Sequence, residues 1–231
     1  MIAERIGMRS KIIGIFLLLG GATSLFAGVV YTQAWDQRGV AYQSQTDPSS
    51  GSLATVYDNF TLASSAVVTD LVWNGGFLHS PTGTITAFTI DFWADSSGQP
   101  GGLLKSATIT GNANATVDPV HPGGGNAYDY SVSGLSFSAT AGTQYWLSIV
   151  ATGDAGDPWG WATGTGGDGR SYEDVTGSGR SLIASDMNFT LSSNGVATPE
   201  PGTLSLAGLA LLAFGLVSRR RKIGSFRCKH A

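Results

Sequence analysis

The middle of the chain alternates hydrophobic and polar residues in short runs. Phe88, Ile90 and Phe92 would share one face of an extended chain, with more polar residues on the other. This period of two is typical of half-buried β-strands. It predicts strands over residues 56–62, 67–75, 88–93, 103–111, 127–133, 134–139, 145–151 and 187–192.

Clusters of Gly, Pro, Asn, Asp and Ser separate these runs, as in the stretches SPTGT, DSSGQPGG and HPGGGN. Such clusters are typical of turns, and the body shows no convincing helical period. The pattern predicts an all-β fold, an antiparallel β-sandwich of jelly-roll type over residues 55–192. Residues 28–54 are less regular, and we expect an irregular segment that leads into the sandwich. Residues 193–198 are expected to form a linker.

Residues 1–27 have the features of a secretory signal peptide. Arg9 and Lys11 precede an apolar run over residues 12–22, and small residues follow up to Ala27. We expect cleavage after Ala27, with signal peptidase and the secretion machinery as partners. Met8 is an alternative start, because the signal is complete without the residues before it.

The C-terminal region is a second apolar segment. Residues 202–217 are almost entirely apolar and would span about 24 Å as a helix. A basic block follows directly, formed by Arg219, Arg220, Arg221 and Lys222. Because cations beside a membrane span stay in the cytoplasm, we expect a short transmembrane helix with the body outside and residues 223–231 inside.

Pro199, Glu200 and Pro201 stand before this apolar segment, and the order of the three elements resembles the PEP-CTERM sorting signal of Gram-negative bacteria. The two prolines keep the tripeptide extended and outside the helix that follows. The resemblance implies processing by an exosortase, a membrane enzyme thought to cut near the tripeptide. It also implies a passing stay in the inner membrane, then the cell surface or extracellular matrix. Relatives typically accompany exopolysaccharide and biofilm systems. The body also resembles, more loosely, the β-sandwich bodies of such proteins.

Charge is distributed unevenly along the chain. Residues 28–201 carry four cations and 15 acidic residues, a net charge of −11, although the whole chain has only −3. This acidity argues against nucleic acid as a partner, because phosphate backbones are repelled. Cys228 is the single cysteine and follows the basic block, so the body has neither a disulfide nor a thiol nucleophile.

Catalytic motifs are missing from the sequence of the body. His79 and His121 both fall in turn-like segments, and no nucleophile elbow, metalloprotease motif or phosphate loop occurs. The aspartates supply no spacing that selects a glycosidase pair. We therefore expect a protein that is not an enzyme and needs no cofactor.

Two weaker candidate sites remain in the body. Trp159 and Trp161 are two residues apart, so on a strand they could stack on a glycan, with packing in the core as the alternative. Asp154, Asp157 and Asp168 lie in Gly-rich loops and could hold a structural Ca²⁺, with turn formation as the alternative. Two functions follow, a non-catalytic surface or matrix protein and a carbohydrate-binding module exported by the same route.

Overall fold

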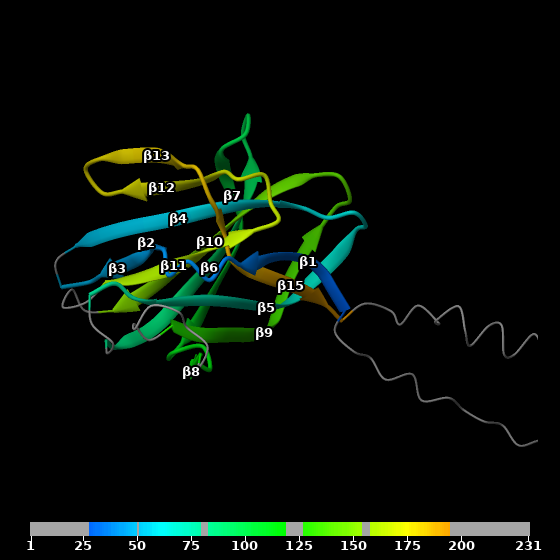
Figure 1. Ribbon diagram of the computed structural model, residues 1–231. Helices are drawn as coiled ribbons and strands as arrows, with labels where there is room; N and C mark the ends of the chain where they lie inside the picture. The colour runs from blue at the N-terminus through cyan, green and yellow to red at the C-terminus, as the bar shows by residue number, and fades with distance from the viewer. Residues whose placement is uncertain (1–27, 50, 80–82, 119–126, 154–157, 195–231) are drawn as a thin grey trace, which may run out of the picture.

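The computed structural model describes residues 28–49, 51–79, 83–118, 127–153 and 158–194. Within these ranges the chain forms strands in two sheets and no helix, so the predicted all-β body is confirmed (Figure 1). The jelly-roll type stays a prediction. None of the described residues belongs to a helix with the length and apolarity to span a membrane. The predicted signal peptide, which we expected to be helical, and the predicted helix over 202–217 lie outside the described ranges.

The first sheet has the order β14-β11-β1-β15-β5-β9-β8, and β2 pairs with β11. All its pairings are antiparallel. Its eight strands in the described ranges are β1 (Gly28–Trp35), β2 (Ala41–Gln43), β5 (Ala66–Phe77), β8 (Thr116–Val117), β9 (Ala127–Ala139), β11 (Trp159–Thr165), β14 (Asp186–Met187) and β15 (Phe189–Ser193).

The second sheet has the order β13-β12-β4-β3-β10-β6-β7, and only β3 and β10 pair in parallel among its described strands. Its seven strands, within the same ranges, are β3 (Gln45–Asp47), β4 (Ser52–Thr61), β6 (Ile85–Asp95), β7 (Pro100–Thr110), β10 (Gln144–Gly153), β12 (Ser171–Val175) and β13 (Gly179–Ile183).

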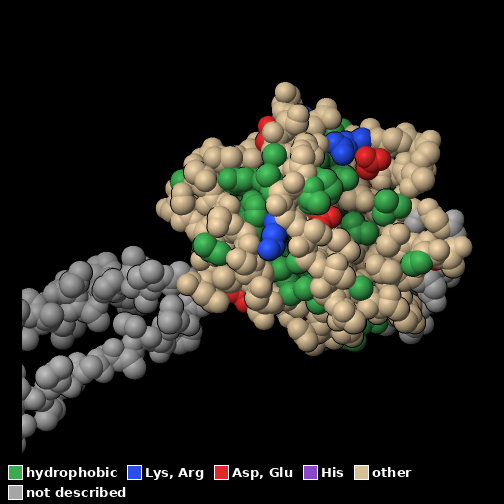
Figure 2. Space-filling model, turned by 180° about the vertical axis from the view of Figure 1, so that it is seen from behind, with side chains coloured by type: hydrophobic (Ala, Val, Ile, Leu, Met, Phe, Trp, Pro, Cys, Tyr) green, Lys and Arg blue, Asp and Glu red, His purple; other side chains and the backbone are tan. Residues whose placement is uncertain are grey.

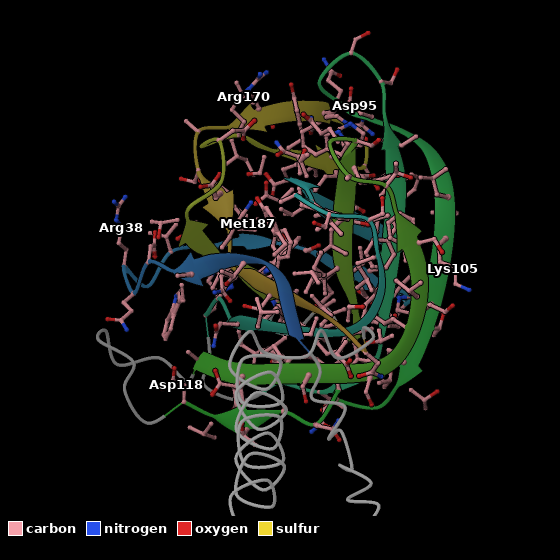
Figure 3. The ribbon with its side chains drawn as sticks, turned by 90° about the vertical axis from the view of Figure 1, so that its right-hand side faces the viewer. Arg38, Asp95, Lys105, Asp118, Arg170 and Met187 are labelled. Atoms are coloured by element: carbon pink, nitrogen blue, oxygen red, sulfur yellow. The ribbon has the colours of Figure 1, made fainter. Side chains whose placement is uncertain are left out.

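The two sheets pack face to face around an aromatic core. The predicted inward face of β6 is confirmed, because Phe88, Ile90 and Phe92 are all buried. Phe92 stacks on Phe137 of β9 in the opposite sheet, with ring centroids 4.2 Å apart. Burying one such side chain stabilises the fold by about 1.5–3 kcal/mol. Figure 3 shows Met187 among the side chains that fill the space between the sheets.

The expectation of an irregular segment over residues 28–54 is corrected by the structure. This segment contains β1, β2, β3 and the beginning of β4. Its alternation is hidden because β1 buries a polar residue, Gln33, where a hydrophobic one would be expected. Gln33 is tolerated there because its Nε2 donates to the carbonyl of Asn59 (3.1 Å) and to the hydroxyl of Tyr31 (2.9 Å).

Candidate functional site

The first and last strands of the body lie side by side. Gly28 on β1 is opposite Ser193 on β15, and Thr32 is opposite Thr190 in the same antiparallel pair. The chain therefore enters and leaves the sandwich at the same corner (Figure 1). Residues 194–198 separate this corner from Pro199, and five residues reach at most about 18 Å. The folded body and the predicted sorting signal are thus held close together.

The residues predicted to form the sorting signal lie outside the described ranges. They are Pro199, Glu200, Pro201, Arg219, Arg220, Arg221 and Lys222. The predicted signal peptide, the apolar segment and the tail lie outside them too. Ser193 of the predicted linker belongs to β15, so the strand continues one residue into that segment.

Trp159 and Trp161 are not a glycan-binding surface, which corrects the prediction. Both side chains are 0% exposed. The indole N–H of Trp159 donates to the hydroxyl of Tyr130 (3.0 Å), and that of Trp161 to the carbonyl of Asn188 (2.7 Å). β11 is covered on both faces over most of its length, and spacing of residues along a strand cannot reveal this. The alternative, packing in the core, is what the structure shows.

The predicted Ca²⁺ ligands are only partly described. Asp154 and Asp157 lie outside the described ranges. Asp168 accepts hydrogen bonds from the backbone N–H of Arg170 (3.0 Å) and from Nδ2 of Asn59 (3.0 Å). No cluster of three His, Cys, Asp or Glu residues suited to a metal occurs in the described part of the chain. Asp168 therefore works as a turn former that ties its loop to β4.

A buried acidic group, not expected from the sequence, lies beneath this loop. Asp58 on β4 is fully buried and accepts hydrogen bonds from the backbone N–H groups of Met187 and Asn59. Burial raises the pKa of Asp58 well above that of an ordinary aspartate, and the nearby carboxylates of Asp186 and Asp168 raise it further. Substrate cannot reach a side chain with no exposed surface, so we interpret Asp58 as structural.

Asp186 on β14 of the first sheet binds the same loop, which connects β11 to β12. Its two carboxylate oxygens accept from the backbone N–H groups of Gly167 (2.9 Å) and Gly169 (2.6 Å). A Cβ on Gly167 would lie 2.5 Å from Nε2 of Gln33 and 2.6 Å from Oδ1 of Asp186, so a larger residue would displace the ends of these two side chains. Asp58 lies in the predicted strand over residues 56–62, on the same face as the hydrophobic Val56 and Phe60. An acidic residue on that face was the sequence signal that could have predicted a buried carboxyl group.

A hollow of about 220 Å³ opens between the ends of several strands. Phe77 and Tyr128 meet edge to face in its wall, with centroids 6.2 Å apart. Tyr130 is held rigidly, because it stacks on Trp73 with centroids 5.4 Å apart and accepts the bond from Trp159. Burial raises the pKa of Tyr130, so its phenol stays neutral. The lining residues are Phe77, Gly83, Ile85, Asn112, Ala115, Tyr128 and Tyr130.

A second aromatic cluster lies on the outer face of the second sheet. It consists of Tyr57, Trp93, Trp146 and Tyr172. Trp93 is partly buried, and the other three side chains are nearly fully buried. The guanidinium of Arg180 lies 4.9 Å from the ring centroid of Tyr57 and donates to the carbonyl of Pro100 (2.9 Å). The β12–β13 hairpin is thereby fastened across this face. Figure 2 shows that hydrophobic side chains are also exposed on the face of the molecule opposite to the view in Figure 1.

Comparison with known proteins identifies one part of the chain. The model of the PEP-CTERM protein-sorting motif family matches residues 197–222, which confirms the sequence-based recognition of this signal. The match includes the tripeptide, the apolar segment and the basic block. No curated protein matches the chain. The motif marks an exported protein that is sorted at a membrane and processed by an exosortase.

Proposed function

We propose that the chain is a non-catalytic surface or matrix protein of a Gram-negative bacterium, released from the inner membrane when an exosortase cuts near Pro199–Pro201. The observation that carries this proposal is the position of the motif. It begins at residue 197, only four residues after β15 ends at Ser193. A folded, disulfide-free body is thus followed at once by the sorting signal. By the resemblance to PEP-CTERM proteins, the released body works with exopolysaccharide, in a surface layer or a biofilm.

The state of the acidic side chains supports a non-catalytic role. Asp58 is inaccessible, Asp168 accepts from the backbone N–H of Arg170 in its own loop, and Asp186 of β14 accepts from the backbone N–H groups of Gly167 and Gly169 in that loop. A general acid or base must reach the proton that it transfers, and the buried carboxyls of Asp58 and Asp186 do not reach solvent-borne substrate in this arrangement. The exposed carboxylate of Asp168 is held by its hydrogen bonds from Arg170 and Asn59. The proposal needs no cofactor, and a structural Ca²⁺ on Asp154, Asp157 and Asp168 stays a prediction.

Substitution of the tripeptide tests the proposal. The triple variant Pro199→Ala, Glu200→Ala, Pro201→Ala should remain membrane-bound at full length in the native host, whereas the unmodified protein reaches the exterior. The control Gly195→Ala, Val196→Ala changes the linker outside the matched residues and should be released normally. Release of the triple variant at the normal rate would overturn the proposal.

Carbohydrate binding by the body is a second candidate function, and the hollow beside Phe77 and Tyr128 favours it. Aromatic rings beside an amide, here Asn112, suit a sugar ring, which offers C–H groups to the rings and hydroxyls to the amide. Tyr128→Ala should abolish binding of the exported protein to the host's own polysaccharide in a pull-down. The control Tyr42→Ala alters a tyrosine outside the hollow. Absence of binding by the unmodified protein would exclude this function.

A further inference from the structure

The β7 strand is a long, open edge of the second sheet. It ends the strand order and runs for 11 residues, with most of its side chains exposed. The other strands that end a sheet in the described ranges are much shorter, with five residues in β13 and two each in β8 and β14. Proteins usually shorten, charge or cover an edge, because its unpaired backbone groups recruit another strand. Among these edges, β7 is the one long enough to pair with another chain.

The backbone groups that β7 offers can be assigned from its pairing with β6. The N–H of Gly111 donates to the carbonyl of Thr86 (2.7 Å), so it faces β6. Alternate residues of an antiparallel strand turn their N–H and C=O to the same side. Ile109 and Ala107 therefore also face β6. The N–H and C=O groups of Ser106, Thr108 and Thr110 point away from the sheet.

The stretch 106–110 combines strand-forming residues with an absence of charge. Its sequence is SATIT, with three β-branched residues. The body around it carries a net charge of −11, which opposes contact between copies over most surfaces. Lys105 is the one charged residue of β7, and it projects away from the molecule (Figure 3). An approach along 106–110 therefore meets little electrostatic repulsion.

We propose that β7 pairs antiparallel with β7 of a second copy of this chain, around a two-fold axis at Thr108, so that the two second sheets become continuous. Thr108 then lies opposite Thr108 of the second copy, and Ser106 opposite its Thr110. The three hydrogen-bonded pairs supply about six backbone bonds. A two-fold contact of this kind uses the same surface on both copies and closes on itself.

This register also suits the side chains. Ala107 lies opposite Ile109 of the second copy, and both residues are partly buried against the core of their own body. Their exposed remainders would be covered by each other, which extends the core across the interface. Lys105 lies opposite Gly111 rather than opposite another lysine, so like charges are not paired directly. The inference rests on the sheet edge alone and does not depend on the proposed function.

Sedimentation velocity of the exported protein over a concentration series tests the proposal. We expect a monomer–dimer equilibrium that Thr108→Pro abolishes, because proline removes an outward N–H and is tolerated at sheet edges. Thr108→Val keeps the N–H and the β-branched shape, so it should dimerise as before. The proposal is overturned if the unmodified protein stays monomeric over an about 100-fold range of concentration. It is also overturned if Thr108→Pro forms the dimer as well as the unmodified protein does.

A pair of charge variants tests the register and guards against misfolding of the proline variant. Ser106→Lys with Thr110→Lys places like charges opposite each other and should weaken dimerisation at least about tenfold. Ser106→Lys with Thr110→Glu places unlike charges opposite each other and should retain the dimer. Both positions are exposed, and both variants lose the same hydrogen bond between Ser106 and Asp91, so the two variants should match each other in the thermal stability of the monomer. Equal dimerisation of the two variants overturns the proposed register.

Discussion

Thr32 on β1 and Thr190 on β15 face each other with their hydroxyl oxygens 2.8 Å apart. This contact joins the first and last strands of the body, although 158 positions separate the two residues. The pairing brings both ends of the sandwich to one corner, beside the linker to the sorting signal. The body can complete its first sheet only when β1 and β15 are both in place.

A disulfide between these positions should form without strain. In Thr32→Cys with Thr190→Cys, directly opposed residues on neighbouring strands satisfy disulfide geometry, and the exterior of the cell is oxidising. Closing so long a loop should stabilise the fold by about 2–4 kcal/mol, read as a raised denaturation midpoint under non-reducing conditions. The control pair Thr32→Cys with Ser192→Cys is out of register and should stay reduced. Failure of the first pair to cross-link in the exported protein would contradict the β1–β15 register.

Gly75→Ala should destabilise the body by about 1–3 kcal/mol, the usual cost of overpacking a core. A Cβ at this position would lie 2.3 Å from the Trp159 ring and 2.6 Å from the carbonyl oxygen of Gly160. Denaturant unfolding followed by tryptophan fluorescence measures the change. Gly102→Ala is the matched control, because its Cβ would meet nothing within 4 Å and its stability should change by less than about 0.5 kcal/mol.

Stability should fall as the pH rises through the range in which Asp58 titrates. Burial raises the pKa of Asp58 in the folded state, whereas the unfolded value is about 3.9. Between these two values the folded state binds more protons than the unfolded state. One such group changes the free energy of unfolding by at most about 1.4 kcal/mol per pH unit. Urea unfolding at several pH values from 4 to 8 measures this slope.

Asp58→Asn isolates this contribution, because the burial of Asp91 and of Glu173 raises their pKa values and acts in the same direction. We expect a shallower dependence on pH in the variant, whatever its absolute stability. An identical slope in both proteins would show that Asp58 does not titrate as inferred.

Arg180→Ala should loosen the β12–β13 hairpin and leave the core intact. The variant loses the contact with the Tyr57 ring, the hydrogen bond to Pro100 and the ion pair with Asp174 (3.5 Å). We expect faster hydrogen exchange over residues 171–183 and a loss of about 1–2 kcal/mol. Within the described residues, Arg170→Ala removes only a long side-chain bond to the Tyr172 hydroxyl (3.4 Å), so it should have little effect. Equal exchange in both variants would exclude the fastening role of Arg180.

The sequence predicted the strands whose inner positions are hydrophobic. β6 and β9 alternate clearly because one face meets the core and the other is more polar. β1 was missed because its buried position holds Gln33, which depends on Asn59 in the other sheet. No local pattern contains that partner.

Of the candidate sites, too, only those that depend on local sequence could be predicted. The sorting signal is a linear motif, so order and spacing were enough to recognise it. The choice between glycan contact and core packing for Trp159 could not be made from the sequence, because the ring is buried by Tyr130 and by Phe88 of the opposite sheet. The hollow at Tyr128 joins residues from distant segments, and only the folded arrangement brings them together.

The intact mass of the exported protein, purified from cells with and without the exosortase, tests the central claim most directly. We predict a mature chain that begins at Gly28 and ends near Pro201 when the enzyme is present. Without the enzyme, the chain should keep the apolar segment and the basic block and stay in the membrane. A C-terminus that remains intact through Ala231 in cells with the enzyme would contradict the account.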